Sequence, residues 1–197
     1  SFFISNYSSS QIPVSNTSIP YNVDFNVPTT LNCTALNPFV DNTTYVGLYS
    51  SQSVYLASNG CSNNGGLHFS GNIGETAFGG RPSATVPTVR FGIGFKNNTG
   101  QLIKSIKINF TEEQWAKAEQ GSGRTAVCEY AVVPLITNVA MAASYIFAPS
   151  FNLTPVITPN LSCTGGLNLL ASPPATRAMS AVFYLNWNPG DELLFWW

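Results

Sequence analysis

Charged residues are scarce in this sequence. Only 9% of its 197 residues are Asp, Glu, Lys or Arg, whereas an ordinary soluble domain has about 25%. The eight basic residues form no run or stripe, so we expect no binding to nucleic acid. Serine, threonine, asparagine and glycine fill the surface role instead, as is typical of extracellular proteins. We therefore predict a protein that lies outside the cell or on its surface.

Long hydrophobic runs and metal-binding clusters are also missing. The longest apolar runs fall far short of the roughly 20 residues that span a bilayer, so we expect no membrane insertion. Residues 1–4 lack the charged start and long apolar centre of a signal peptide. His68 is the single histidine, and none of the four cysteines stands in a CxxC pair. We therefore predict no metal and no cofactor.

Catalytic motifs are absent as well. A glycosidase needs two carboxylates that face each other across a cleft, but Glu112 and Glu113 are adjacent and would point to opposite faces of a strand. No GxSxG elbow accompanies His68. The glycine-rich residues 71–80 carry no GxxxxGK[ST] phosphate loop and are interpreted as turns. We predict that the protein is not an enzyme.

What the sequence does contain is alternation of apolar and polar residues, most clearly in residues 89–115. Phe91, Ile93 and Phe95 alternate with small or charged residues, and the same period of two recurs over residues 102–110. This pattern predicts two half-buried strands. The Asn-Asn-Thr-Gly sequence at residues 97–100 predicts a tight turn between them.

Similar short patterns recur along the whole chain. Further strands are predicted at residues 21–27, 45–49, 54–57, 124–134, 145–151, 178–187 and 192–197. Residues 111–120 either form a short helix that begins with a Thr111–Gln114 capping box or continue the preceding strand to Trp115. The sequence therefore predicts an all-β, antiparallel, jelly-roll-like β-sandwich with at most one short helix. We expect an N-terminal arm at residues 1–20 and one domain at residues 21–197.

The cysteines and asparagines suggest covalent modification. The four cysteines form either two disulfides or buried free thiols; they are Cys33, Cys61, Cys128 and Cys163. We favour disulfides that pair Cys33 with Cys61 and Cys128 with Cys163, because these close the shorter loops. The Asn-x-Ser/Thr triplets either arise by chance or carry glycans; they start at Asn6, Asn16, Asn32, Asn42, Asn97, Asn109, Asn152 and Asn160. Asn97, at the predicted turn tip, and Asn109, on an outward parity, are the favoured sites.

Several blocks of the chain resemble a known family. The sequences FKNNTGQLIKS at residues 95–105 and FTEEQW at residues 110–115 are similar to a β-sandwich domain of secreted bacterial surface proteins with PEP-CTERM or type IX sorting signals. Looser matches follow in the same order, namely TAFGG at residues 76–80, CEYAV at residues 128–132 and WNPGDELLFWW at the end. The resemblance implies surface display or adhesion, and it implies no catalytic residues. The cysteines and the many triplets depart from the family pattern, and family members continue past the last tryptophan with an acidic stretch.

The two ends of the chain suggest how copies could associate. The sequence ends in LLFWW at Trp197, which predicts an apolar strand at an uncovered sheet edge. Either the chain is a fragment, or an arm from a neighbouring copy covers this edge. The apolar residues Phe2, Phe3 and Ile4 are candidates for such a donated strand. Head-to-tail donation of this kind builds filaments.

Aromatic residues offer the alternative of ligand binding. Aromatic rings stack on the apolar C–H faces of sugars, and Trp115 and Trp196 are the candidates. Our first hypothesis is a non-enzymatic, extracellular structural or adhesive surface protein that assembles with itself by donor-strand exchange. The alternative is a carbohydrate- or receptor-binding head, of a lectin-like or viral-fibre type, that recognises a host-surface glycan.

Overall fold

The computed structural model describes residues 11–18, 20–23, 25, 36–58, 64–72, 75–115, 125–140, 145–156 and 175–197. Within these ranges the chain consists of strands and one 3-10 helix, η1 (Pro149–Phe151), and it has no α-helix. The predicted all-β, sandwich-like fold is confirmed. In the part of the chain that is described, no helix has the length and apolar character needed to cross a membrane.

A six-stranded sheet forms one layer of the sandwich. Its strands, in spatial order, are β1 (Ile12–Val14), β7 (Phe91–Asn97), β12 (Glu192–Trp196), β9 (Glu129–Val133) and β10 (Ile146–Phe147), and β3 (Leu48–Ser50) also pairs with β7. Strand β1 runs parallel to the end of β7, whereas β3 runs antiparallel to its start. Because β12 occupies the other edge of β7, β1 and β3 share one edge in succession.

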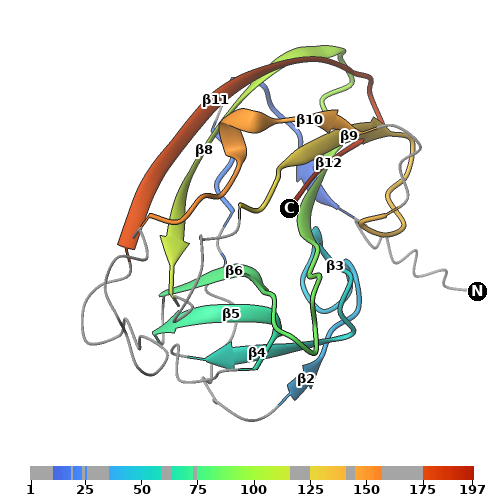
Figure 1. Cartoon of the computed structure of the whole chain (residues 1–197). Coiled ribbons are helices and arrows are strands. Elements are labelled where there is room, and N and C mark those ends of the chain that lie inside the picture. Colours follow the sequence, from blue (N-terminus) through green and yellow to red (C-terminus); the bar gives the residue numbers. More distant parts are fainter. Residues whose placement is uncertain are drawn as a thin grey trace, which may run out of the picture.

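The opposite layer consists of two separate pieces (Figure 1). One is a long antiparallel ribbon of β8 (Ile103–Gln114) and β11 (Ala175–Trp187). The other is a four-stranded sheet of β2 (Leu36–Pro38), β4 (Val54–Ser58), β5 (Gly66–Asn72) and β6 (Glu75–Arg81). In Figure 1 the ribbon arches across the top of the molecule and the four-stranded sheet lies below it.

The core follows the alternation along the central strands. Leu193 and Phe195 of β12 are at most 1% exposed and pack against Phe183 and Trp187 of the ribbon. Burial of each such side chain stabilises the fold by about 1.5–3 kcal/mol. A second cluster around Phe69 lies in the four-stranded sheet, and a third around Tyr49 includes Leu194 and Trp196, the neighbours of the first cluster's residues on β12. Side chains of β12 therefore pack on both faces of the six-stranded sheet.

Strand predictions differ from the structure in two places. The described part of the glycine-rich residues 71–80, interpreted as turns, belongs to the antiparallel strands β5 and β6, in which Phe69 and Phe78 pair with ring centroids 5.0 Å apart. Backbone ladder bonds need no side chain, and Gly80 fits here because a Cβ would lie 2.8 Å from Val89 Cγ1. Conversely, the described part of residues 21–27 is not a strand. Phe25 instead accepts a hydrogen bond at its backbone oxygen from Thr76 Oγ1, at 2.5 Å.

Two further boundaries needed the structure. Residues 111–114 continue β8, so the strand alternative holds there and the capping-box helix does not start at Thr111. The predicted strand at residues 145–151 is reduced to the two residues of β10, followed by η1. Part of the predicted arm, β1, is integrated into the six-stranded sheet, so the body begins earlier than residue 21.

Candidate functional site

A large hollow separates the two pieces of the split layer. It has a volume of about 2010 Å3 and is lined by the consecutive residues 105–115 of the β8 segment and 76–81 of β6. Alternate residues of a strand point to opposite faces, so consecutive lining means that the hollow runs along the strand edges. Within the described ranges, β8 pairs only with β11 and β6 pairs only with β5. The hollow therefore lies between one long edge of β8 and one of β6.

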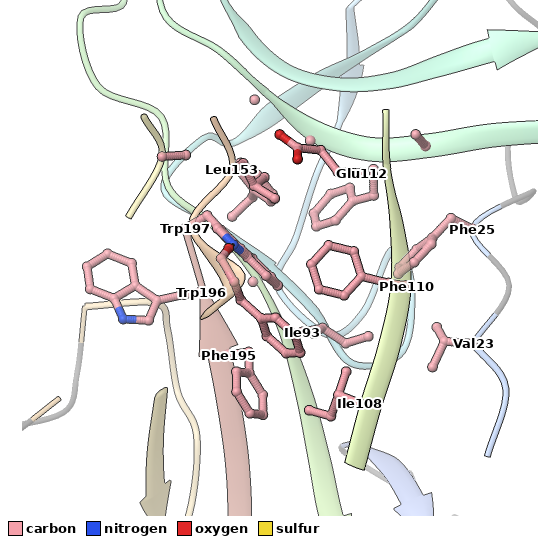
Figure 2. A pocket seen from close by; sticks show the side chains of 18 of the residues that line it. Val23, Phe25, Ile93, Ile108, Phe110, Glu112, Leu153, Phe195, Trp196 and Trp197 are labelled. Carbon is pink, nitrogen blue, oxygen red and sulfur yellow. The ribbon is translucent and has the colours of Figure 1, made fainter. Parts of the chain in front are cut away.

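The walls of the hollow are mainly aromatic and aliphatic (Figure 2). Trp197 stacks on Phe91 with ring centroids 5.7 Å apart, and it meets Phe110 of β8 edge-on at 5.8 Å. The Trp197 indole is held in place because its Nε1 donates a hydrogen bond to the Phe151 backbone oxygen at 2.7 Å. Phe91 in turn contacts Phe78 of β6, at 5.7 Å. Aromatic contacts thus connect β8, the C-terminal residue after β12, β7 and β6 around the hollow.

An ion pair lies at the C-terminal part of β8. The Arg177 guanidinium donates to a carboxylate oxygen of Glu112, and also to the Thr154 backbone oxygen at 3.1 Å. Neighbouring Glu113 accepts a hydrogen bond from Trp115 Nε1 at 2.7 Å. The two carboxylates thus have different partners, as expected for adjacent strand residues that point to opposite faces. They form an ion pair and an aromatic support, which is not the facing-carboxylate geometry of a glycosidase.

The predicted stacking residues are both largely covered. Trp115 and Trp196 are each only 8% exposed. Trp196 borders the hollow, but its ring points away from the other labelled side chains (Figure 2), with the Arg90 guanidinium 4.8 Å from its ring centroid and Tyr145 also 4.8 Å away. Neither ring presents an open face of the kind that sugars stack on. Among the described aromatic side chains, Tyr184 of β11 is the most exposed, at 81%, followed by Phe147 at 69% and Tyr21 at 52%. The parity of Tyr184, opposite to buried Phe183, was the sequence signal that could have identified it.

The glycosylation candidates differ sharply in environment. Asn97 is 1% exposed, and its Nδ2 donates to the backbone oxygens of Gln101 and Trp187, each at 2.8 Å. A glycan is attached at this nitrogen, so the geometry speaks against Asn97, although it was a favoured site. Asn16 and Asn109 are exposed, which fits attachment.

The other triplets are half-buried or outside the described residues. Asn42 accepts a hydrogen bond from Gly47 N at 2.7 Å, and Asn152 accepts one from Cys128 N at 2.9 Å. Both hydrogen bonds are accepted by Oδ1, so they do not involve Nδ2, the atom to which a glycan is attached. The predictions for Asn6, Asn32 and Asn160 lie outside the described residues.

Cys128 is a buried thiol in the structure and forms no disulfide. Burial raises the pKa of this thiol, and the nearby Glu129 carboxylate raises it further. Both effects lower the reactivity of Cys128, because the thiolate is the reactive form. Cys33, Cys61 and Cys163 lie outside the described residues, as do the donated-strand candidates Phe2, Phe3 and Ile4. The free thiol of Cys128 contradicts its predicted pairing with Cys163, whereas the pairing of Cys33 with Cys61 stays a prediction.

His68 and the acidic residues form no metal centre in the described part of the chain, where no group of three or more potential ligands occurs. His68 is 6% exposed, and its Nε2 lies 3.0 Å from the Asn64 backbone oxygen. Burial lowers its pKa, the contact with Asn64 opposes that shift, and the charge of Arg81 adds to it. A histidine in this setting is a neutral packing residue of β5.

No known family model, curated protein or solved structure matches this chain. The resemblance to bacterial surface domains therefore stays a prediction from the quoted sequence blocks. The geometry alone must support a functional conclusion. Its most distinctive feature is a mainly apolar hollow that runs beside β8 and β6.

Proposed function

We propose that this protein is a non-enzymatic, extracellular structural or adhesive surface protein that assembles into filaments by donor-strand exchange. The hollow of one copy would receive the N-terminal segment of the next copy. The observation that supports this proposal is the hollow itself, which runs beside β8 and β6 and is walled by aromatic side chains. A strand added to a free edge gains main-chain hydrogen bonds and places alternate side chains in pockets.

The volume of the hollow suits a peptide better than a small ligand. Strand rise, strand spacing and sheet separation together give roughly 160 Å3 for each residue of a packed strand. A hollow of about 2010 Å3 thus holds roughly a dozen residues. Pockets for drug-sized ligands are commonly about 300–1,000 Å3. The expected occupant is an extended segment about as long as β8.

Residues 1–10 match these requirements in length and chemistry. Ten extended residues span about 33 Å, and the side chains of Phe2, Phe3 and Ile4 suit aromatic walls. Donation by one copy to the next is heterologous and head-to-tail, so it propagates as a filament. The low charge of the chain is consistent with close packing of many copies without strong repulsion.

Acceptor and control variants test the proposal directly. Ile108 lines the hollow, whereas Val182, which pairs with Lys107 beside it, is 50% exposed on the outside of the ribbon. We expect the full chain to form filaments visible by electron microscopy. Ile108→Arg places a charge in the hollow and should leave folded monomers, whereas Val182→Arg should leave filaments intact. Circular dichroism shows whether each variant is folded.

Mixing provides a second, independent test. A donor-defective chain, Phe3→Ser with Ile4→Ser, mixed with the Ile108→Arg chain should stop at one-to-one complexes in light scattering. A synthetic peptide of residues 1–10 added in excess should shorten wild-type filaments. A wild-type chain that stays monomeric at high concentration, or filaments that neither Ile108→Arg nor the peptide affects, would overturn the proposal.

A second function is favoured by one observation, the exposure of Tyr184. This ring is 81% exposed on the outer face of the ribbon and lies across from Ser105. An exposed ring beside hydroxyl groups is suited to bind a sugar. Glycan-array binding that is lost in Tyr184→Ala but kept in Trp115→Phe would support a carbohydrate-binding head. Equal binding by wild type and Tyr184→Ala would remove this candidate.

A further inference from the structure

A buried carboxylate, that of Glu192, contacts both a glutamine and a lysine. Glu192 and Gln11 are each 0% exposed, and Gln11 Nε2 donates a hydrogen bond to Glu192 Oε2 at 3.0 Å. Lys96 Nζ lies 3.8 Å from the other carboxylate oxygen, Oε1. A carboxamide and an amine are therefore held on the two oxygens of one carboxylate that is shielded from water. We refer to Gln11, Lys96 and Glu192 as the Lys96 cluster.

The register of the six-stranded sheet brings the Lys96 cluster together on one face. Glu192 of β12 is the register partner of Lys96 on β7, and side chains of directly opposite residues lie next to each other on the same face. Gln11 immediately precedes β1 and lies against Gly94 of β7. Gly94 and Lys96 share a face, because side chains alternate along a strand. The three reactive groups thus converge from three neighbouring segments of the sheet.

Close packing holds the Gln11 carboxamide in position. A Cβ at Gly94 would lie 2.4 Å from Gln11 Oε1, so the carboxamide rests directly on the backbone of β7. Gln11 Nε2 also donates a hydrogen bond to the Tyr49 hydroxyl, and the Ile136 backbone nitrogen donates one to Glu192 Oε2 at 2.6 Å. The carboxamide and the carboxylate are thus oriented before any reaction, which lowers the entropic part of the barrier to a reaction between neighbouring groups.

We propose that Lys96 and Gln11 of the same chain become joined by an isopeptide bond, with Glu192 as the group that transfers protons. Glu192 takes one proton from Lys96 Nζ, and the neutral amine attacks Gln11 Cδ. A bond forms between Nζ and Cδ, and the bond between Cδ and Nε2 breaks. Glu192 delivers its proton to the leaving Nε2 and takes the second Nζ proton in exchange. The products are the amide that joins Lys96 to Gln11 and one ammonia, which leaves with the remaining proton as ammonium.

The bond ties the short strand β1 to the centre of the sheet. Strand β1 has three residues and, within the described ranges, pairs only with β7, so few backbone hydrogen bonds hold it in place. A covalent link between positions 11 and 96 restricts the unfolded chain and therefore stabilises the fold. The reaction takes place within one chain, so it goes beyond the proposed function and does not depend on filament formation.

Mass spectrometry of the intact full chain, made in a host that attaches no N-glycans, tests the proposal. We expect a mass below that of the sequence by one ammonia, and a proteolytic fragment in which Lys96 and Gln11 are joined. A chain with the full mass of its sequence would overturn the proposal, as would an ammonia loss located at other residues. Loss of one water with a Lys96–Glu192 link would also overturn it, because Glu192 would then be the acyl group.

Matched variants assign the role of each group. Lys96→Arg keeps the positive charge but removes the primary amine, and Glu192→Gln keeps the side-chain shape but removes the proton-transferring carboxylate. Neither variant should lose ammonia, whereas Lys104→Arg, at an exposed lysine of β8, should lose it as the wild type does. Lys96→Arg should melt about 10 °C below Lys104→Arg, because it lacks the cross-link. A joined Lys96–Gln11 fragment from the Glu192→Gln chain would overturn the role of Glu192.

Discussion

Asn97 begins an Asn-x-Thr triplet but is buried, so its substitution tests whether this side chain stabilises the fold. Its side chain makes four hydrogen bonds: Nδ2 donates to Gln101 O and Trp187 O, and Oδ1 accepts from Thr99 N at 3.0 Å and Thr99 Oγ1 at 2.6 Å. Asn97→Ala removes all four. Trp187 is 2% exposed, so its backbone oxygen would lose a partner that water cannot easily replace.

The size of the effect follows from these contacts. A buried carbonyl left without a partner costs about 1–3 kcal/mol, and the turn bonds to Thr99 contribute about 1 kcal/mol more. We therefore expect Asn97→Ala to lower the free energy of unfolding by about 3 kcal/mol. For a chain of this size each kcal/mol corresponds to about 2–4 °C, so the melting temperature should fall by about 6–12 °C.

Asn109 provides the matched control. It is also the first residue of an Asn-x-Thr triplet, but it is exposed, and its Oδ1 accepts a hydrogen bond from Ser180 Oγ across the ribbon at 2.7 Å. Asn109→Ala should change stability by at most about 0.5 kcal/mol. Differential scanning calorimetry measures both variants, and peptide mass spectrometry locates glycans on the wild-type chain. A shift below about 2 °C for Asn97→Ala, or a glycan on Asn97, would refute the reasoning.

Three further predictions follow from buried groups. Gly94→Val should lower the urea midpoint, by about 1–3 kcal/mol in free energy, because its Cβ would lie 2.9 Å from Ile136 Cδ1; an unchanged midpoint would contradict the close packing. Burial lowers the pKa of His68 below its usual 6.5, so the unfolded chain binds more protons and stability should fall as pH drops below about 6.5; His68→Gln should flatten this decline in thermal melts, and an equally steep decline would exclude His68 as its cause. Cys128 should react with a thiol reagent only when the protein unfolds, as followed by mass spectrometry of its peptide; rapid labelling of the folded chain would contradict its burial.

The sequence pattern predicts some of the strands around the candidate site and misses others. Period-two alternation predicted β7 and β8 well, because each strand has one apolar face in the core. The last strand was predicted at an uncovered sheet edge, but β12 lies between β7 and β9 and is buried on both faces. The alternation did not predict β5 and β6, whose glycine-rich sequences resemble turns. Backbone pairing gives these residues an extended conformation that their side chains do not encode.

Residue type alone did not predict whether a side chain is buried or exposed. Asn97, Trp115 and Trp196 are residue types commonly found at glycan sites or sugar-binding surfaces, yet tertiary contacts bury all three. The exposure of Tyr184 could have been predicted from parity alone, since it alternates with Phe183. The hydrogen bonds of Gln11 with Tyr49 and Glu192 could not, because these residues lie far apart in the sequence and share no local pattern.

By itself, the sequence determined that this chain folds from short β-strands, since the period of its apolar residues requires extended backbone with one buried face. Its low charge and its lack of catalytic motifs are likewise properties of the sequence. Only the tertiary structure decided that one layer of the sandwich is split and that a hollow runs between β8 and β6. Strand neighbours are chosen by long-range packing and backbone pairing, which no local window of sequence contains.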